Sequence, residues 1–133
     1  MDDPTWISVE MAIAIHRRQL AEHGGADGVR DQGLLESALS RPRHLFAYSD
    51  PTPKAPQLAA AYAFGIAKNH AFVDGNKRTA AVVCETFLVL NGCELTATDA
   101  EMYPVFLAVA SGDLSEEQLV DWLIQNTHRI EKP

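Results

Sequence analysis

A dense group of polar residues, NHAFVDGNKRTA, occupies positions 69–80 between two segments rich in alanine and valine. The helical periodicity on both sides predicts that His70 ends one long helix and that Asn76 caps the next. A helix N-terminus presents free backbone N–H groups and the positive end of the helix dipole, so it favours an anion. Lys77 and Arg78 place two cations at that same end, where they cost stability unless a bound anion compensates. The pattern therefore predicts a phosphate site.

Three further residues of this stretch would complete a site for phosphoryl or nucleotidyl transfer. Asp74 could hold a magnesium ion beside the phosphates, because Mg²⁺ is usually bound by one or two carboxylates together with substrate oxygens. Gly75 allows a positive φ or a close approach of the backbone to a ligand. His70 could act as a general base toward an attacking hydroxyl, since an imidazole titrates near neutral pH.

Each of these residues alone has a simpler interpretation. A histidine beside an apolar helix is usually structural or exposed, and Asp74-Gly75-Asn76 is also an ordinary turn followed by a helix cap. Lys77 and Arg78 could be a solvated face. None of these explanations accounts for all the features falling within nine residues, with both cations at the unfavourable end of a helix. We therefore favour a transfer site, with Phe72 anchoring the loop in the core.

Composition limits the classes of protein that the chain can be. Its 133 residues suit one domain, and 47% hydrophobic with 22% charged residues is an ordinary globular mixture. The net charge of −7 disfavours non-specific contact with nucleic acid or an anionic membrane. The N-terminus does not resemble a signal peptide, and no apolar run reaches the roughly 18 residues of a membrane span. We expect a single domain over residues 1–133, in the cytoplasm, with no direct contact to nucleic acid or membrane.

The hydrophobic pattern is helical nearly throughout, which predicts an all-α fold. In the N-terminal half we expect a helix over residues 9–23 capped by Ser8, and a short helix over residues 34–42 that Pro42 stops. The proline-rich stretch 45–55 is expected to be an exposed connection.

The C-terminal half starts with Pro56 in the first turn of a helix over residues 57–70. A helix over residues 77–91, apolar on most of its circumference and containing Cys84 as a core residue, is expected to be the central buried helix. Two capping boxes, Thr98-x-x-Glu101 and Ser115-x-x-Gln118, predict the last two helices. Pro104 should bend the first of these or delay its start, and residues 93–98 could pair briefly in a small hairpin.

The stretch HAFVDGNKRTA resembles the motif of the Fic/Doc proteins, specifically the death-on-curing (Doc) toxins of type II toxin–antitoxin systems. Seven of the nine positions from His70 to Arg78 match: His70, Phe72, Asp74, Gly75, Asn76, Lys77 and Arg78. Upstream, residues 28–42, GVRDQGLLESALSRP, are similar to the N-terminal region of Doc-type chains. The resemblance implies a single-domain Fic/Doc helical bundle around a central hydrophobic helix.

Two positions depart from the wider Fic pattern, HPFxxGNGRxxR, of relatives that transfer AMP. Lys77 replaces a glycine that leaves room for the nucleotide's diphosphate, and Ala81 stands in place of the second arginine. The loss of an arginine removes a bidentate phosphate clamp, and the lysine adds volume and charge. The nucleotide should therefore sit differently. These two departures match the Doc subfamily. Resemblance to that subfamily implies transfer of the ATP γ-phosphate to a threonine or serine hydroxyl of a translation factor. The implied substrate is elongation factor Tu, and the implied result is arrest of protein synthesis.

The resemblance also implies roles for individual residues, with ATP and Mg²⁺ as cofactors. His70 would be the base, Asp74 the magnesium ligand, and Gly75, Asn76, Lys77 and Arg78 the phosphate-binding segment. Lys68 could also reach phosphate or substrate, although a merely exposed lysine explains it equally well. Arg30 and Asp31, at the start of a helix, are expected to form only a local ion pair.

Regulation is expected to come from a second protein. Some Fic proteins silence themselves with an internal [ST]xxxE[GN] helix, but no glutamate in this chain is followed by glycine or asparagine. The resemblance implies a small antitoxin whose disordered C-terminal segment folds on this chain. Two other functions stay open: a Fic-type AMP transferase, and a catalytically idle Fic-fold module that acts by binding alone.

Overall fold

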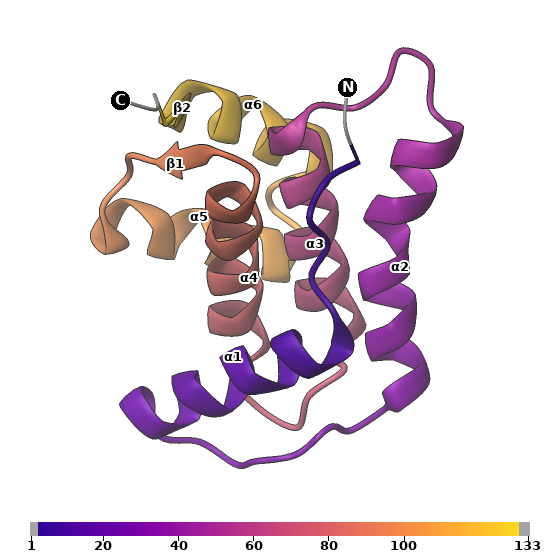
Figure 1. The fold of residues 1–133 in the computed structure, drawn as a ribbon. Helices are drawn as coiled ribbons and strands as arrows, with labels where there is room; N and C mark the ends of the chain where they lie inside the picture. The colour runs from indigo at the N-terminus through magenta and orange to yellow at the C-terminus, as the bar shows by residue number, and fades with distance from the viewer. Residues whose placement is uncertain (1–2, 131–133) are drawn as a thin grey trace.

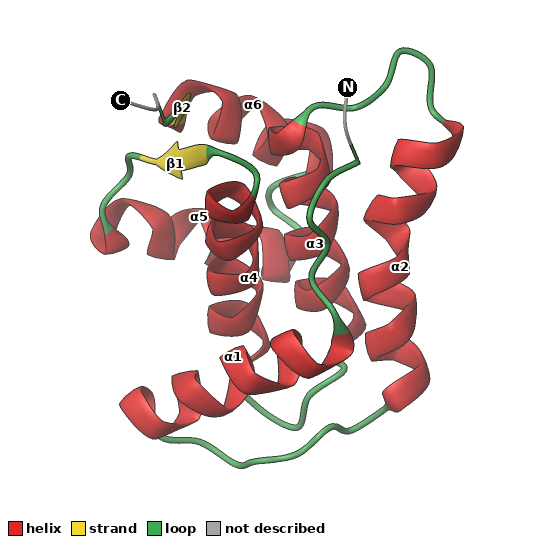
Figure 2. Ribbon diagram, viewed as in Figure 1, coloured by secondary structure: helices red, strands yellow, loops and turns green. Residues whose placement is uncertain are grey.

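The computed structural model describes residues 3–130, and the prediction of an all-α fold is confirmed for this range (Figures 1 and 2). The chain order is α1 (Val9–His23), α2 (Gln32–Tyr48), α3 (Ala55–Asn69), α4 (Asn76–Leu90), β1 (Cys93–Leu95), α5 (Asp99–Ser111), α6 (Glu116–Asn126) and β2 (Thr127–Arg129). Among the described helices, none combines the length and the apolar character that crossing a bilayer requires.

The centre of the molecule is a pair of antiparallel helices, α3 and α4 (Figure 1). Helix α2 packs on one side of α3, α5 and α6 lie on the other side of the pair, and α1 crosses the ends of α3 and α4. Nine of the 15 residues of α3 are buried, against seven of the 15 in α4. The prediction that one helix over residues 77–91 forms the centre is therefore incomplete, because the alanine-rich α3 shares that position. Gly65 allows the close contact with α2, since a Cβ there would lie 3.3 Å from the Ala38 Cα.

Helix α2 is longer than its sequence pattern predicts, and the prediction that Pro42 stops it is wrong. Asp31 caps the helix through its carboxylate, which accepts a hydrogen bond from the Leu34 N–H (3.0 Å). The helix then continues through Pro42 to Tyr48. Its last turns pack against the core, where Phe46 meets the ring of Trp6 edge-on at 5.7 Å. This apolar packing compensates for the backbone hydrogen bond that proline cannot donate.

The C-terminal half confirms the two predicted capping boxes, at Thr98 and at Ser115. Pro104 lies inside α5, which begins at Asp99, so the helix has no late start. Residues 93–95 do not form a local hairpin; they pair as β1 with β2, antiparallel, with Cys93 opposite Arg129. Cys84 lies in the core as expected, and burial raises the pKa of its thiol well above the usual value.

Candidate active site

The junction between α3 and α4 lies at the end of the molecule that α1 crosses (Figure 1). Helix α3 ends at Asn69, and His70 is its C-cap in the left-handed conformation, with φ 50° and ψ 48°. His70 is the one residue other than glycine with a positive φ within the described range 3–130. The N-cap of α4 is Gly75, with φ 75°, and Asn76 is the first helical residue. The prediction that His70 ends a helix is confirmed, whereas the prediction that Asn76 is the cap is wrong.

Asn76 does not cap the helix because its side chain holds the loop instead. Its Oδ1 accepts a hydrogen bond from the Phe72 N–H, and its Nδ2 donates one to the Phe72 carbonyl, both at 3.0 Å. The side chain is buried. Both polar atoms of the amide are thus engaged with the loop backbone, so any contact of Asn76 with an anion would come from its backbone N–H in the first turn of α4.

Phe72 anchors the loop as predicted, and its partner in the core is a histidine that the sequence analysis did not identify. Phe72 is 1% exposed, and the ring of His16 stacks on it with centroids 3.9 Å apart and planes 8° from parallel. His16 Nε2 donates a hydrogen bond to the Asp74 carbonyl at 2.7 Å. One signal in the sequence could have found it: His16 shares the buried face of α1 with Ala12 and Gln19, at helical spacing.

The connection between α1 and α2 lies directly against the α3–α4 loop. The Arg30 and Asp31 N–H groups both donate to the Ala71 carbonyl (2.7 and 3.1 Å), and Val73 N–H donates to the Gly28 carbonyl (3.0 Å). The Arg30 side chain donates to the carbonyl groups of the α3 terminus. The prediction that Arg30 and Asp31 form only a local ion pair is therefore wrong. The former holds the end of α3, and the latter caps α2.

The carboxylate of Asp74 is exposed and partly satisfied by backbone N–H groups. Its Oδ1 accepts a hydrogen bond from the Gly75 N–H (2.8 Å), and its Oδ2 lies 3.4 Å from the Ala26 N–H. Gly25 lies beside this carboxylate with φ 123°, a conformation that residues with a Cβ rarely adopt, so glycine is favoured at this contact. A carboxylate with lone pairs open to solvent suits Mg²⁺, which takes its other ligands from water and phosphate and needs no cage of protein side chains.

The structure brings six of the seven predicted site residues to the α3–α4 junction, Asn76 among them, and directs the seventh, Lys68, elsewhere. His70 and Asp74 flank the loop, Gly75 caps α4, and Lys77 and Arg78 are exposed in the first turn of that helix. Lys68 also lies near this end of α3, but its ammonium sits over the Phe64 ring, 5.7 Å from the centroid. That ammonium also approaches Gly112, in the turn after α5.

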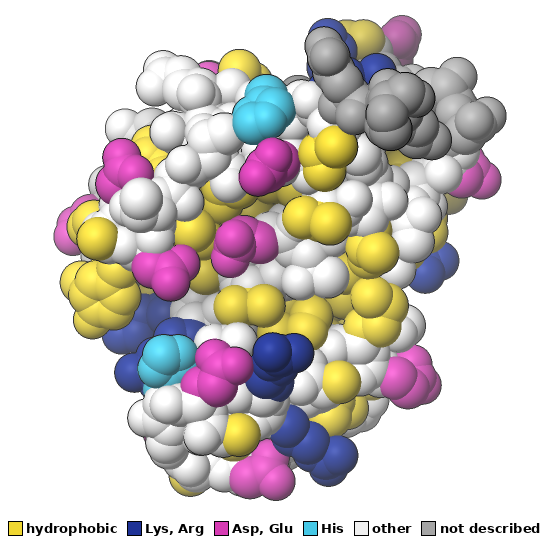
Figure 3. Space-filling model, turned by 60° about the vertical axis from the view of Figure 1, so that its left-hand side comes forward, with side chains coloured by type: hydrophobic (Ala, Val, Ile, Leu, Met, Phe, Trp, Pro, Cys, Tyr) yellow, Lys and Arg dark blue, Asp and Glu magenta, His cyan; other side chains and the backbone are white. Residues whose placement is uncertain are grey.

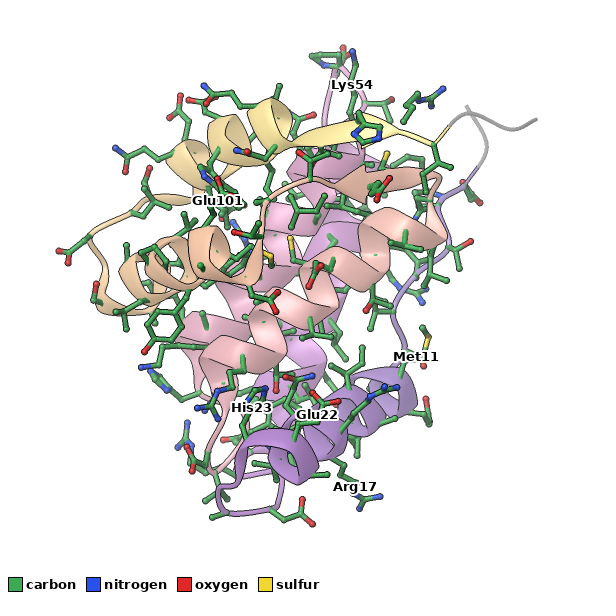
Figure 4. All side chains as sticks on the ribbon, turned by 90° about the vertical axis from the view of Figure 1, so that its left-hand side faces the viewer. Met11, Arg17, Glu22, His23, Lys54 and Glu101 are labelled. Carbon is green, nitrogen blue, oxygen red and sulfur yellow. The ribbon has the colours of Figure 1, made fainter. Side chains whose placement is uncertain are left out.

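A cleft of about 350 Å³ begins at Lys77 and Arg78 and runs between α4, α5 and the C-terminal end of α1. Apolar side chains line much of it, namely Ala81, Val82, Met102, Phe106 and Leu107. Figure 3 shows hydrophobic side chains across the middle of this side of the molecule, with acidic groups above them and most basic groups below. Glu22 and His23 contribute from α1, on its side toward α4 (Figure 4).

Glu85 lies half-buried in this cleft. Burial raises the pKa of its carboxyl above 4.5, and the charge of Asp99 raises it further. Between pH 4.5 and the higher pKa of the folded state, the folded protein keeps a proton on Glu85 that the unfolded chain has released. The free energy of unfolding therefore falls as the pH rises through this range.

We expect the Glu85→Gln variant to melt at a higher temperature than the wild type at pH 7, because the glutamine is never ionised. The two proteins should converge below pH 4, where Glu85 is protonated in both states. Thermal unfolding followed by circular dichroism at several pH values measures this difference. The matched control is Glu36→Gln, at an exposed position on α2. A difference that does not change with pH would contradict the prediction.

Two relatives with known names are similar to this chain. Toxin Doc of Mycolicibacterium smegmatis is 47% identical over 74 residues, which cover 56% of this chain and 57% of that protein. Protein kinase doc of Escherichia phage P1 is 32% identical over 117 residues, which cover 88% of this chain and 91% of that protein.

The Fic/DOC family model matches residues 6–88, from the segment before α1 almost to the end of α4. This range contains the cleft wall formed by α4, the α3–α4 loop and the α1–α2 connection that packs against it. The family match, the similarity to protein kinase doc along most of both chains and the all-α fold agree with one another. The chain therefore belongs to the Fic/DOC family.

Proposed function

We propose that this protein is the toxin of a toxin–antitoxin system and acts as a kinase. It transfers the γ-phosphate of ATP to a threonine or serine hydroxyl of a translation factor, with elongation factor Tu as the expected substrate, and so arrests protein synthesis in the cytoplasm. One observation carries the proposal: His70, Asp74, Lys77 and Arg78 meet at a single helix-to-helix junction. The names of the two relatives, a toxin and a protein kinase, support it.

The residues at the junction have chemistry that fits ATP and Mg²⁺. When bound, ATP would supply the phosphoryl group and Mg²⁺ would supply positive charge beside it. The N–H groups at the start of α4, together with Lys77 and Arg78, would bind phosphate oxygens, and Asp74 would hold the metal ion. The imidazole of His70 accepts the proton of the attacking hydroxyl.

Two side chains favour γ-phosphate transfer over AMP transfer. Lys77 lies in the first turn of α4 and Ala81 in the second, and both line the cleft. Lys77 supplies a cation where AMP-transferring relatives have a glycine, and the Ala81 methyl cannot clamp a phosphate as their second arginine does. Lys77 and the first turn of α4 would therefore hold a triphosphate without a second arginine clamp, which would favour a different phosphate next to the attacking hydroxyl.

The position of the radioactive label in ATP distinguishes the two reactions. We expect purified protein with Mg²⁺ to label elongation factor Tu from [γ-³²P]ATP and not from [α-³²P]ATP, because only the terminal phosphate moves in a kinase reaction. Gel autoradiography and mass spectrometry of the labelled factor measure the result. A reaction without Mg²⁺ is the control. Label from the α-position would instead establish an AMP transferase and overturn the kinase proposal.

The proposal includes an antitoxin whose disordered C-terminal segment folds on this chain. The cleft beside α4 has the features that an amphipathic segment requires, with apolar side chains along it and exposed Tyr103 and Leu107 at its rim. Its charges differ along its length, with Lys77 and Arg78 at one end and carboxylates elsewhere, including Glu85. A segment bound there would lie next to the predicted phosphate site, which gives a direct way to block it.

A further inference from the structure

His70 is held in a backbone conformation that a histidine rarely adopts. For a residue with a Cβ, the left-handed region costs about 1–2 kcal/mol, because the Cβ crowds the following carbonyl oxygen. Such a residue persists only when its surroundings fix it, and such residues gather at functional sites. The question is which contacts fix His70, whose side chain is exposed.

Arg30 supplies these contacts from the α1–α2 connection, 40 residues earlier in the chain. Its Nε donates to the His70 carbonyl at 2.7 Å, and its Nη2 donates to the Asn69 carbonyl at 3.1 Å. Its backbone N–H donates to the Ala71 carbonyl at 2.7 Å. The carbonyls of three consecutive residues, with His70 in the middle, are thus all bound by one arginine.

This arrangement suits the end of a helix. The last carbonyls of a helix have no partner within it and carry the negative end of the dipole, so a guanidinium is a favourable partner there. The planar guanidinium binds two carbonyls in a fixed relative orientation, which a lysine ammonium cannot reproduce. The backbone of Arg30 is itself fixed, since its neighbour Val29 pairs with Phe72 and Asp31 caps α2.

We propose that Arg30 is a positioning residue, which keeps the His70 backbone in the left-handed conformation and so aims the imidazole at the attacking hydroxyl. The inference rests on the proposed function only for the role of the imidazole; the contacts of Arg30 do not depend on it. Arg30 differs in this from Lys77 and Arg78, whose charged groups have no protein acceptor among the described residues and so remain available to phosphate.

Steady-state kinetics distinguish positioning from phosphate binding. We expect Arg30→Ala to lower kcat about 10²-fold, the loss typical of a misplaced catalytic group, and to leave the KM for ATP unchanged. The kcat of Arg30→Lys should fall between those of the wild type and Arg30→Ala, because a single ammonium group replaces the two guanidinium donors. The matched control is Arg17→Ala on the outer side of α1, which should behave as the wild type (Figure 4). A higher KM with unchanged kcat would make Arg30 a phosphate ligand and overturn the inference.

A second measurement does not require any activity. The ¹³C chemical shifts of His70 and Asn69 report the backbone conformation, so NMR should show both moving in Arg30→Ala and in Arg30→Lys, while core resonances of the two variants stay in place. Unmoved His70 shifts in either folded variant would overturn the inference. If the wild type transfers no phosphate while the shifts move as expected, the proposed function fails and the positioning role of Arg30 stands.

Discussion

The His70→Ala variant is expected to phosphorylate its target about 10²–10⁴-fold more slowly than the wild type, the usual contribution of a general base. The imidazole is exposed and has no hydrogen-bond partner or ring contact within residues 3–130, so its loss should leave the fold intact. Transfer from [γ-³²P]ATP measures the rate, and induced expression in a bacterial host measures the growth arrest. His70→Asn is a useful second variant, because asparagine tolerates the left-handed backbone and still removes the base.

The control for this experiment is His44→Ala, which removes an exposed histidine from the last turns of α2, whereas the start of α2 is the end that lies against the α3–α4 loop. That variant should keep full activity. If growth arrest were unchanged in His70→Ala and in Asp74→Ala, the chain would be a binding module with a Fic fold and not an enzyme. If transfer were lost while growth arrest remained, the toxicity would have a cause other than phosphorylation.

The second large effect is expected at Asn76, where stability and activity should fall together. Asn76→Ala leaves the buried N–H and carbonyl of Phe72 without their partners. An unsatisfied buried polar group costs about 1–3 kcal/mol, so we expect the free energy of unfolding to fall by about 2–5 kcal/mol. Urea denaturation measures this loss. Activity should fall as well, because the same two hydrogen bonds hold the loop between His70 and the start of α4.

Two variants make this prediction specific. Asn76→Asp keeps the shape and the acceptor for the Phe72 N–H, but it replaces the donor to the Phe72 carbonyl with a second oxygen, so it too should be destabilised. Lys77→Ala changes the next residue, which is exposed, and should leave the unfolding free energy nearly unchanged. If Asn76→Ala kept its stability and only raised the KM for ATP, the side chain would be a phosphate ligand and not a clamp of the loop.

Features that depend on neighbours within a few residues could be predicted from the sequence. Helix α1 begins and ends at the predicted residues because Ser8 and Gly24 act within one turn of it. The two capping boxes at Thr98 and Ser115 are equally local. The same holds for the central part of the site, since His70, Asp74 and the start of α4 are joined by a loop of five residues and cannot lie far apart.

Predictions failed where a distant contact outweighed a local preference. Pro42 disfavours a helix locally, yet α2 continues because Leu45 and Phe46 pack against the core. Residues 93–95 pair with β2, which begins at Thr127, 32 positions after β1 ends at Leu95, and not with their neighbours in the chain. Asn76 has the usual properties of a cap, but Gly75 takes that place because the amide is bonded to Phe72.

The sequence by itself determined the type of chemistry, the family resemblance and the residues that would carry the reaction, because these lie together in one motif. Only the tertiary structure decided what holds that motif in shape. His16 acts on the loop from 58 residues away and Arg30 acts on His70 from 40 residues away. The physical reason is that a hydrogen bond requires two groups within about 3 Å, and for groups so distant in the chain only the packing of α1 and its connection across the ends of α3 and α4 brings them together.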